Sequence, residues 1–360
     1  MREIVELTKS MIRFKSMHSR PDEISACADF VGNYLSEHGL EWKRLDYEGV
    51  PSVLAFPERC RAPVLLMSHI DVVDAPDELF EPYESDGKLF GRGSIDDKYA
   101  AALSMVLFKE HVERKRKQGR GQRDLSFGIL ITGDEEAGGK KGARQALAEI
   151  EASFCIALDG GGLRKIVAKE KGILRLKLLS RGKTAHGARP WLGENAIENL
   201  ITDYAKIKPF FDLTAPEHWH RTLNFGIVKA GKSPNQVPDF AEALFDIRYT
   251  ENDDVEGLVE AMRKQVRGEL VVEAVEPLFH GGDSPYLDLL LSIARDTNVG
   301  FEHGASDARF LSDHGIKGIV WGADGDMTQH SEDEHLNIES AIQLYEILDE
   351  FIKRGEEGRI

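Results

Sequence analysis

The sequence predicts an α/β protein with a mixed, mainly parallel sheet and a smaller α+β domain inserted into it. The main observation is that short apolar runs end in carboxylates. Residues 128–132, just before Asp134, are the clearest example, and such a run indicates a strand buried on both faces. These runs alternate with amphipathic helices over residues 1–170 and 280–360, whereas residues 171–279 are richer in strands. A chain of 360 residues also exceeds the usual size of one core, so we expect two domains.

The composition argues against nucleic acid or a membrane as the partner. There are 62 acidic and 46 basic side chains, and the net charge of -16 opposes binding to polyanions and to anionic lipid. No run of about eighteen apolar residues could span a membrane, and the N-terminus lacks the apolar core of a signal peptide. The scattered Cys27, Cys60 and Cys155 suit a reducing compartment. We expect a cytoplasmic protein that acts on a small molecule or a short peptide.

The first predicted helices and strands are followed by a histidine at a strand end. Periodic apolar residues predict amphipathic helices over residues 3–14 and 22–38. Strands are expected next at residues 40–47, 52–56 and 64–68. His69 and Asp71 follow and point to the same side of an extended segment, where the carboxylate can hold the imidazole in its metal-binding tautomer. A lone histidine is more often structural, but this pair lies at a strand end in a chain with a second acidic strand end, which favours a ligand.

The next segment of the sequence contains both glycines and carboxylates. Gly91 and Gly93 precede Asp96 and Asp97, which lie at the start of a helix expected over residues 97–111. Acids at a helix N-terminus are stabilised by about 0.3–1 kcal/mol without any further role. A helix cap does not need the two glycines, whereas close approach of the backbone to a metal site often does. The segment therefore favours a metal ligand over a simple cap.

Two further strands end in acids. The strand over residues 128–132 leads to the three carboxylates of residues 134–136, and a helix over residues 141–150 follows. The next strand, over residues 154–158, leads to Asp159. Adjacent carboxylates repel one another, so they are either fully solvated or neutralised by a metal. The recurrence of acids at strand ends favours the metal.

The remaining elements define the inserted domain and the return to the first one. Strands are expected at residues 172–180, 223–231, 240–249 and 270–277, and helices at residues 195–208 and 254–268. This pattern suggests a small antiparallel sheet with helices on one face. The α/β alternation then returns. Helices are expected near 285–296 and at 338–352, a further helix is expected to begin with residues 304–310, and a strand is expected at 318–321.

The strand ends and neighbouring loops together contain His69, Asp96, Glu135, Glu136, Asp159 and His330. Imidazoles and carboxylates drawn from distant segments are the ligands of a dinuclear zinc site. Each zinc would take one histidine, one carboxylate of its own and a share of a bridging carboxylate. One carboxylate must then stay off the metals to act as a base.

These motifs resemble metallopeptidase family twenty, the dinuclear zinc amidohydrolases and exopeptidases that include acetylornithine deacetylase, succinyl-diaminopimelate desuccinylase, aminoacylase and dipeptidases. The family's H-x-D motif is similar to residues 69–71, its G-R-G-x-x-D motif to residues 91–96, and its adjacent glutamates to residues 135–136. His330, four residues before Glu334, resembles the C-terminal ligand. The resemblance covers nearly the whole chain. It implies a zinc-exopeptidase-like catalytic domain and a ferredoxin-like lid domain through which two chains form a homodimer.

The resemblance also implies a role for each matched residue. The cofactors would be two divalent metal ions, with Zn²⁺ expected and Co²⁺ or Mn²⁺ as alternatives. The catalytic residues would be Glu135, as the general base, and Asp71. The metal ligands would be His69, Asp96 as the bridge, Glu136, Asp159 and His330. The substrate-binding residues would be His186, Asn235, Arg248, Gly304 and Ser306, of which His186 reaches the neighbouring active site in dimeric relatives.

The implied reaction is hydrolysis of an amide bond beside a free carboxylate. Zinc lowers the pKa of a water toward ~7, and this water gives a proton to Glu135 and attacks the carbonyl. Two signals about the substrate conflict. Asp159, where deacylases usually have Glu, resembles the dipeptidase and aminopeptidase branch, whereas residues 235–238 and 304–309 resemble the deacetylase and desuccinylase branch. Deacylase and dipeptidase therefore both stay open.

Two other classes of protein remain as alternatives. A non-catalytic metal- or ligand-binding protein on the same scaffold would be indicated by loss of the base or of a ligand, and neither is missing. A nucleotide-binding protein would need a phosphate loop, but Gly91-Arg-Gly93 lacks a third glycine and ends in acids that repel phosphate. The chain departs from the family at Asp97, where relatives often have Met, and this change removes no ligand.

Overall fold

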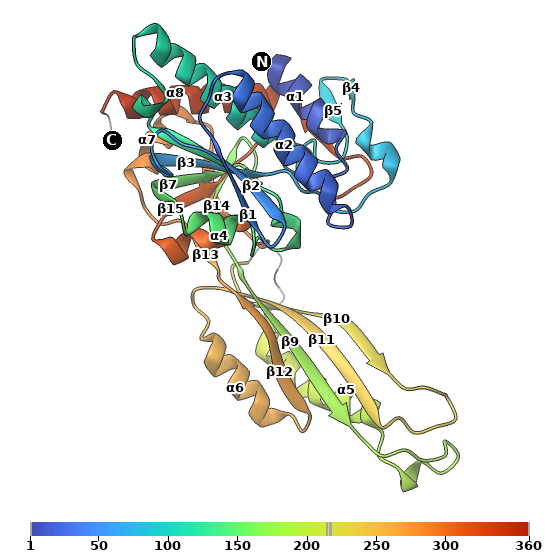
Figure 1. Ribbon diagram of the computed structural model, residues 1–360. Helices are drawn as coiled ribbons and strands as arrows, with labels where there is room; N and C mark the ends of the chain where they lie inside the picture. Colours follow the sequence, from blue (N-terminus) through green and yellow to red (C-terminus); the bar gives the residue numbers. More distant parts are fainter. Residues whose placement is uncertain (1, 214, 216–217, 359–360) are drawn as a thin grey trace. The chain divides into compact units, whose positions relative to one another are not determined.

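The computed structural model describes residues 2–213, 215 and 218–358, and the chain divides into two compact units (Figure 1). The larger unit contains the chain up to Lys169, Phe279–Glu302 and the chain from Ser306 onward. The smaller unit contains Glu170–Leu278 together with His303–Ala305. The smaller unit is thus an insertion in the larger one.

The larger unit is built on a mixed sheet. Its strands are β1 (Lys43–Tyr47), β2 (Val50–Ala55), β3 (Arg61–His69), β6 (Phe127–Thr132), β7 (Glu151–Ala157), β8 (Lys165–Glu170), β13 (Phe279–His280), β14 (Asn298–Glu302) and β15 (Lys317–Val320). They lie in the order β1-β2-β6-β3-β7-β15-β8-β13, and β14 pairs with β8. The central strands β6, β3, β7 and β15 run parallel, whereas β1, β2 and β8 pair antiparallel. The α/β class with a mixed, mainly parallel sheet is confirmed.

Apolar side chains on the two faces of this sheet form two separate cores. Along β3, Leu66 belongs to one core and its neighbours Leu65 and Met67 to the other, as the period of two in a strand requires. The first core is covered by α1 (Arg2–Ile12), α2 (Pro21–Glu37), α3 (Lys98–Lys117), α7 (Pro285–Ile293) and α8 (Ile338–Glu356). The second is covered by α4 (Ala143–Leu147) and the 3-10 helix η6 (Asp307–His314). A strand buried on both faces, as predicted for residues 128–132, follows from this arrangement.

A small antiparallel sheet joins distant parts of the larger unit. It contains β4 (Tyr83–Ser85), β5 (Lys88–Phe90) and β16 (His335–Asn337), in the order β16-β5-β4. The pairing sets His335 opposite Phe90. It therefore brings the segment that contains His330 beside the segment that contains Asp96. These strands are not among the predicted ones, because three residues are too few to show a period.

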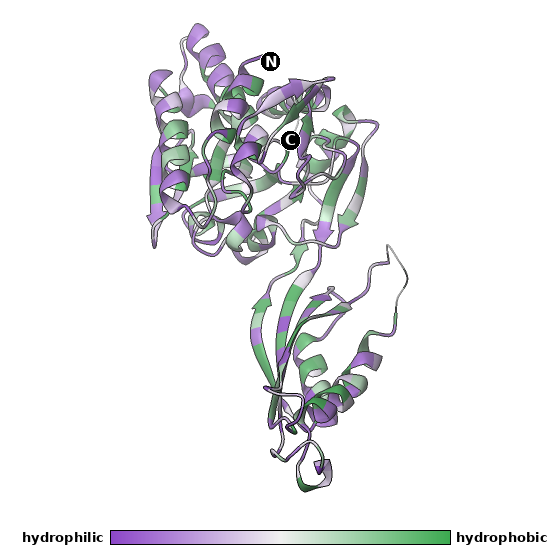
Figure 2. Cartoon of the chain, turned by 90° about the vertical axis from the view of Figure 1, so that its right-hand side faces the viewer, coloured by the Kyte–Doolittle hydropathy of each residue, from purple (hydrophilic) through white to green (hydrophobic). Residues whose placement is uncertain are grey.

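The inserted unit has a ferredoxin-like fold, as predicted. Its strands β9 (Gly172–Arg181), β10 (Thr222–Ala230), β11 (Phe240–Tyr249) and β12 (Glu269–Glu276) are antiparallel in the order β10-β11-β9-β12. Helices α5 (Ala196–Ile207) and α6 (Val255–Gln265) pack on one face of the sheet. The side chains of Asn195 and Asp254 accept backbone N–H groups and cap these helices. In each unit the apolar residues gather between sheet and helices (Figure 2).

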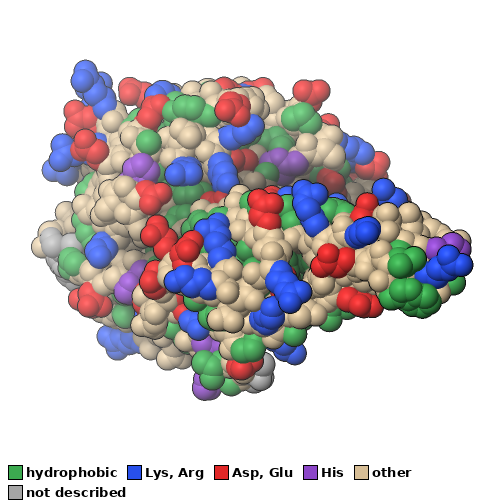
Figure 3. All heavy atoms as spheres, turned by 90° about the horizontal axis from the view of Figure 1, so that it is seen from below, with side chains coloured by type: hydrophobic (Ala, Val, Ile, Leu, Met, Phe, Trp, Pro, Cys, Tyr) green, Lys and Arg blue, Asp and Glu red, His purple; other side chains and the backbone are tan. Residues whose placement is uncertain are grey.

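One predicted helix is of a different type. The helix expected to begin with residues 304–310 is the 3-10 helix η6, and the hydroxyl oxygen of Ser306 accepts the N–H of Ala308 at its start. In the part of the chain that the structure describes, no helix is both long and apolar enough to cross a membrane. Acidic and basic side chains are interspersed over the face of the molecule shown in Figure 3.

Candidate metal centre

The parallel strands of the larger unit end at one edge of the sheet. His69 is the last residue of β3 and lies opposite Thr132, the last residue of β6. Asp159 comes two residues after the end of β7, and Asp96 comes two residues before the start of α3. In open α/β sheets the ligands bind beyond the carboxyl ends of the strands. The fold therefore assembles the predicted acids and His69 where a binding site is expected.

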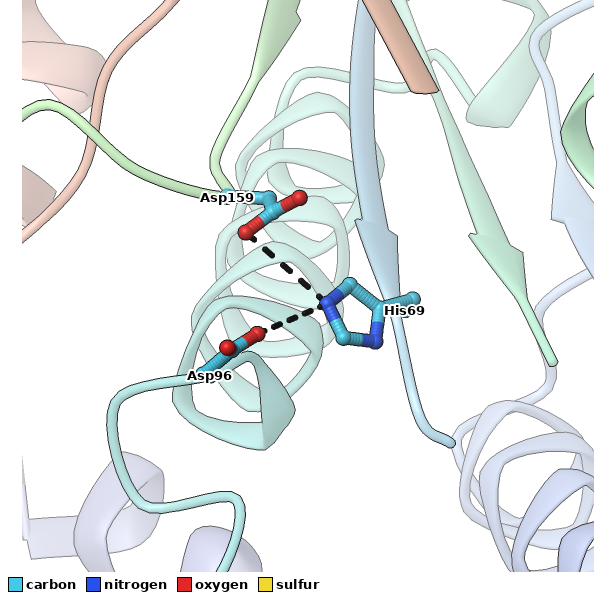
Figure 4. Close-up of side chains that lie close together, drawn as sticks. All are labelled: His69, Asp96 and Asp159. Carbon is cyan, nitrogen blue, oxygen red and sulfur yellow. Dashed lines mark hydrogen bonds and ion pairs between the residues drawn. The ribbon is translucent and has the colours of Figure 1, made fainter. Parts of the chain in front are cut away.

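Two overlapping groups of potential ligand atoms lie at this edge. In the first, Nε2 of His69 is 3.0 Å from Oδ1 of Asp96 and 3.8 Å from Oδ1 of Asp159 (Figure 4). In the second, Nε2 of His330 is 3.1 Å from Oδ2 of Asp96 and 3.0 Å from Oε1 of Glu136. The ligand atoms of each group lie within 4.8 Å of one another. Asp96 belongs to both groups and contributes a different oxygen to each.

The donor set fits two divalent cations. Each group offers one imidazole nitrogen and two carboxylates, which are donors that zinc prefers. Nδ1 of His69 lies 3.0 Å from the carbonyl oxygen of Asp71 and 3.4 Å from its Oδ1, so Nε2 is the nitrogen that faces the first group. Metal-binding histidines are typically held by such a contact at the other ring nitrogen. The backbone oxygen of Asp71 is therefore nearer to Nδ1 of His69 than the carboxylate of Asp71 is.

The electrostatics of the site indicate an excess of negative charge. Burial raises the pKa of Glu135 well above its usual range, and the carboxylates of Asp159 and Asp307 add to this effect. Hydrogen bonds to Asp96 and Glu136 raise the pKa of His330 to about 10. Like charges that are held together out of water favour protonation or a bound cation. Divalent cations would therefore stabilise this arrangement.

The acidic turn is held by a buried aspartate. The 3-10 helix η3 (Glu135–Ala137) follows β6, and Oδ1 and Oδ2 of Asp71 accept the N–H groups of Glu135 and Glu136 at 3.1 and 2.9 Å. Asp134 has a different role, because its carboxylate accepts the N–H groups of Lys141 and Gly142, both at 2.8 Å. Of the three adjacent carboxylates, one shapes the loop and two remain for the site.

A buried ion pair joins the segments of Asp96 and His330. Oε1 of Glu334 accepts the N–H groups of Gly93 and Asp96 at 2.8 and 3.4 Å, and Oε2 of Glu334 pairs with Arg92. Arg92 also donates to the carbonyl oxygen of His330 at 3.1 Å. In the sequence, Glu334 is distinguished only by its spacing from His330. Its partnership with Arg92 joins residues more than two hundred positions apart, and no local pattern indicates it.

The start of η6 supplies a further buried carboxylate. Asp307 lies beside Glu135, His69 and Asp159 around a small cavity, and burial raises its pKa to about 8. Arg309 donates to the carbonyl oxygen of Gly138 at 2.7 Å and so joins η6 to the acidic turn. Asp307 is not among the predicted site residues, although the nearby Gly304 and Ser306 are. The motif over residues 304–309 is the signal that could have included it. Ser306 belongs to the larger unit, whereas Gly304 groups with the inserted one.

A larger cavity lies elsewhere in the same unit. It has a volume of about 580 Å³ and is lined by residues at the amino ends of β3 and β7, among them Arg61 and Glu151. None of the ligand atoms of the two groups lines it. The chemistry of the donor set, rather than cavity size, identifies the candidate site.

The predicted substrate residues of the inserted unit lie at two ends of its sheet. Gly187, the residue after His186, donates to the carbonyl oxygen of Asn235 at 2.7 Å, so His186 and Asn235 are neighbours where β9 ends and β11 begins. Arg248 lies at the far end of β11, opposite Ile173 at the start of β9. Eight residue steps along β11, at ~3.4 Å each, separate the two ends by about 27 Å. One chain does not bring these residues together.

The fold and the site together define a class of protein. A sheet that gathers two histidine and carboxylate groups at its strand ends, beside a glutamate that belongs to neither group, is typical of metal-dependent hydrolases of amide bonds. The chain belongs to peptidase family M20/M25/M40, whose family model matches residues 65–354. The resemblance inferred from the motifs is confirmed, and the chain is an enzyme of the metallopeptidase and amidohydrolase class.

Similarity to individual proteins extends over nearly the whole chain. The chain is 26% identical to a "Probable carboxypeptidase" of Uncinocarpus reesii over 402 residues, which cover 98% of this chain and 88% of that one. It is 26% identical to the succinyl-diaminopimelate desuccinylase of Nitratiruptor sp. over 379 residues, covering 98% and 99%. The solved structure of a tripeptidase from Staphylococcus aureus has a TM-score of 0.79 at 20% identity and covers 99% and 98%. The structural likeness shows a shared fold.

Proposed function

We propose that the protein hydrolyses an amide bond beside a free carboxylate, as a deacylase of N-acyl amino acids similar to acetylornithine deacetylase and succinyl-diaminopimelate desuccinylase. The observation that supports it most is the pair of ligand groups that share Asp96, with Glu135 outside both. A desuccinylase and a carboxypeptidase among its relatives are consistent with this reaction. Ligand groups without a free base would have favoured a binding protein instead.

His69, Asp96 and Asp159 would hold one cation, and Asp96, Glu136 and His330 the other. We propose zinc, for which cobalt or manganese would substitute. When bound, these cations supply Lewis-acid chemistry, because they polarise the scissile carbonyl and lower the pKa of a water. The half-buried setting of the carboxylates strengthens their attraction for the cations.

Glu135 would act as the general base and then as the general acid. The backbone N–H of Glu135 is held by Asp71, and its side chain lies beside the cavity that His69 and Asp159 also line. It takes a proton from the attacking water and returns it to the leaving nitrogen as the C–N bond breaks. Burial raises the pKa of Glu135, which brings this carboxyl group toward the range where proton acceptance and return are both feasible.

Arg248 and the pair of His186 and Asn235 would bind substrate from different chains of a homodimer. Their separation of about 27 Å along one sheet supports this division, because one active site is smaller than that. Arg248 would bind the free carboxylate, although Oδ1 of Asp246 is already 2.7 Å from its Nε. Gly304 and Ser306 would complete the substrate site.

A second candidate function is that of a dipeptidase or aminopeptidase. Asp159 favours it, because this position in the motif resembles the branch that acts on peptides, and the tripeptidase structure shares the fold. The two candidates differ in the group that lies on the far side of the scissile bond. A deacylase accepts an acyl group there, and a dipeptidase accepts an amino acid with a free amine.

A hydrolysis screen distinguishes these functions. Protein loaded with zinc or cobalt is incubated with N-acetyl and N-succinyl amino acids, with dipeptides, and with the same compounds as C-terminal amides. A deacylase cleaves the N-acyl compounds and loses activity when the carboxylate becomes an amide. A dipeptidase prefers compounds with a free amine. Protein that binds two metals but cleaves none of the compounds would support the non-catalytic alternative.

Replacement of Asp96 by alanine is expected to lower metal content at both sites. The side chain contributes Oδ1 to one group and Oδ2 to the other, so its loss removes a ligand from each. Equilibrium dialysis with zinc measures the number of ions bound. The matched variant Asp159→Ala alters only one group and should retain one ion. Asp96→Ala protein that binds one ion with native affinity would refute the bridging role.

A further inference from the structure

The loop between α1 and α2 lies alongside the segment that follows β3. The hydroxyl group of Ser16 donates to the carbonyl oxygen of Ile70 at 2.6 Å, and the N–H of Val72 donates to the carbonyl oxygen of Ser16 at 3.0 Å. Met17 and Val72 form a parallel bridge. The next residue of the loop, His18, is thereby brought next to Asp71, and its Nε2 is 2.9 Å from Oδ2 of that carboxylate.

The carboxylate of Asp71 is fully buried and is shared by several donors. Its Oδ2 accepts the N–H of Glu136 at 2.9 Å in addition to the contact with His18. Its Oδ1 accepts the N–H of Glu135 at 3.1 Å and lies 3.4 Å from Nδ1 of His69. This one carboxylate therefore helps to position three groups of the site: the backbone of Glu135, the backbone of Glu136 and the ring of His69.

His18 supplies the positive charge that this carboxylate needs. The hydrogen bond to Asp71 raises the pKa of His18, although its partial burial opposes the charged form, and the charges of Asp134 and Glu136 also favour the imidazolium. His69 is neutral when it binds a metal through Nε2. Among the described contacts of Asp71, His18 is then the cationic one. Without it, a buried carboxylate would be balanced by neutral donors alone, which is costly.

We propose that His18 is a positioning residue for the hydrolysis: its Nε2–H donates to Oδ2 of Asp71 and fixes the carboxylate that holds Glu135 and Glu136. This inference rests on the proposed roles of these two glutamates. Groups that orient a ligand from outside typically change affinity or activity by about 10- to 100-fold when they are removed. Since His18 touches neither ligand group, its loss should lower kcat and leave KM nearly unchanged.

Three variants test the proposal. His18→Ala removes the donor, and His18→Gln retains an N–H near the position of Nε2. Ser19→Ala is the matched control, because the hydroxyl of Ser19 joins the same two segments through Oδ1 of Asp74 at 2.7 Å without touching Asp71. We expect kcat of His18→Ala to fall about 10- to 100-fold and Ser19→Ala to match the native enzyme. His18→Gln should recover part of the loss, because glutamine keeps the N–H donor but not the positive charge.

Metal affinity can be measured without any turnover, so it tests this proposal independently of the proposed function. Competition with a zinc chelator is expected to show about 10- to 100-fold weaker binding of one ion in His18→Ala and native binding in Ser19→Ala. This result would support the proposal even if no amide were cleaved by the native protein. Native kcat and native metal affinity in His18→Ala would overturn it. Equal losses in His18→Ala and Ser19→Ala, or no recovery in His18→Gln, would also overturn it, because the loop alone would then be responsible.

Discussion

Replacement of Glu135 by glutamine is expected to leave both metal ions bound and to lower kcat by about 10²- to 10⁴-fold. The side chain of Glu135 belongs to neither ligand group, so the number of ligands is unchanged. The backbone N–H that binds Asp71 is also retained. A neutral amide has no site that can accept the proton of the attacking water, so the variant keeps the site and loses the proton transfer.

Metal analysis and single-turnover kinetics on the same sample test this expectation. The matched variant is Glu136→Gln, which changes the adjacent side chain in the same turn and should lose affinity for one ion. Turnover of Glu135→Gln at the native rate would remove Glu135 from the role of base. Loss of an ion from Glu135→Gln would make it a ligand. Equal metal loss in both variants would mean that the turn itself has been disturbed.

The strand ends were predictable because their signals are local. The apolar residues 127–132 are buried along their whole length, and the acids after them lie at the same edge as His69 and Asp159. The carboxyl ends of neighbouring parallel strands lie at the same edge of the sheet, so acids that follow such strands are expected to lie near one another. The ferredoxin-like insertion was predictable for a similar reason, since its strands and helices are long enough to show their periods.

The hydrogen bonds that hold the site residues in place were not predictable in the same way. Asp71 was assigned to the orientation of His69, but its carboxylate also holds the N–H groups of Glu135 and Glu136. Those contacts join a strand end to a turn more than sixty residues later, and hydrogen bonds to the backbone require no particular side chain at the donor. The same is true of Glu334, which binds the N–H of Gly93. Only the assembled fold reveals such contacts.

The inserted unit supplies a reason to expect that two chains contribute to one active site. The side chain of His186 is exposed, and its Nδ1 accepts the N–H of Ala188 at 3.1 Å. The ring proton of a neutral His186 is therefore on Nε2, where it can be donated to an oxyanion. Arg248 lies about 27 Å away along the same sheet. If Arg248 binds the substrate of its own chain, His186 must act on another one.

Mixed dimers are expected to recover activity that neither parent has. His186→Ala should lower kcat by about 10²- to 10³-fold, the usual loss when one donor to an oxyanion is removed. Glu135→Gln is expected to lose activity for a different reason, the absence of the base. When the two variants exchange subunits, one of the two active sites of a mixed dimer contains native Glu135 from one chain and native His186 from the other. Activity should then rise to about a quarter of the native value in an equal, fully exchanged mixture, because half of the dimers are mixed and each has one complete site.

Two different tags allow the mixed dimers to be purified and their composition to be checked by mass spectrometry. The matched control mixes Glu135→Gln with Asp159→Ala, because both residues belong to the larger unit and both sites of the mixed dimer stay defective. Recovery in the first mixture and none in the control would support action of His186 across the dimer. Verified mixed dimers with no recovered activity would instead mean that His186 serves its own chain.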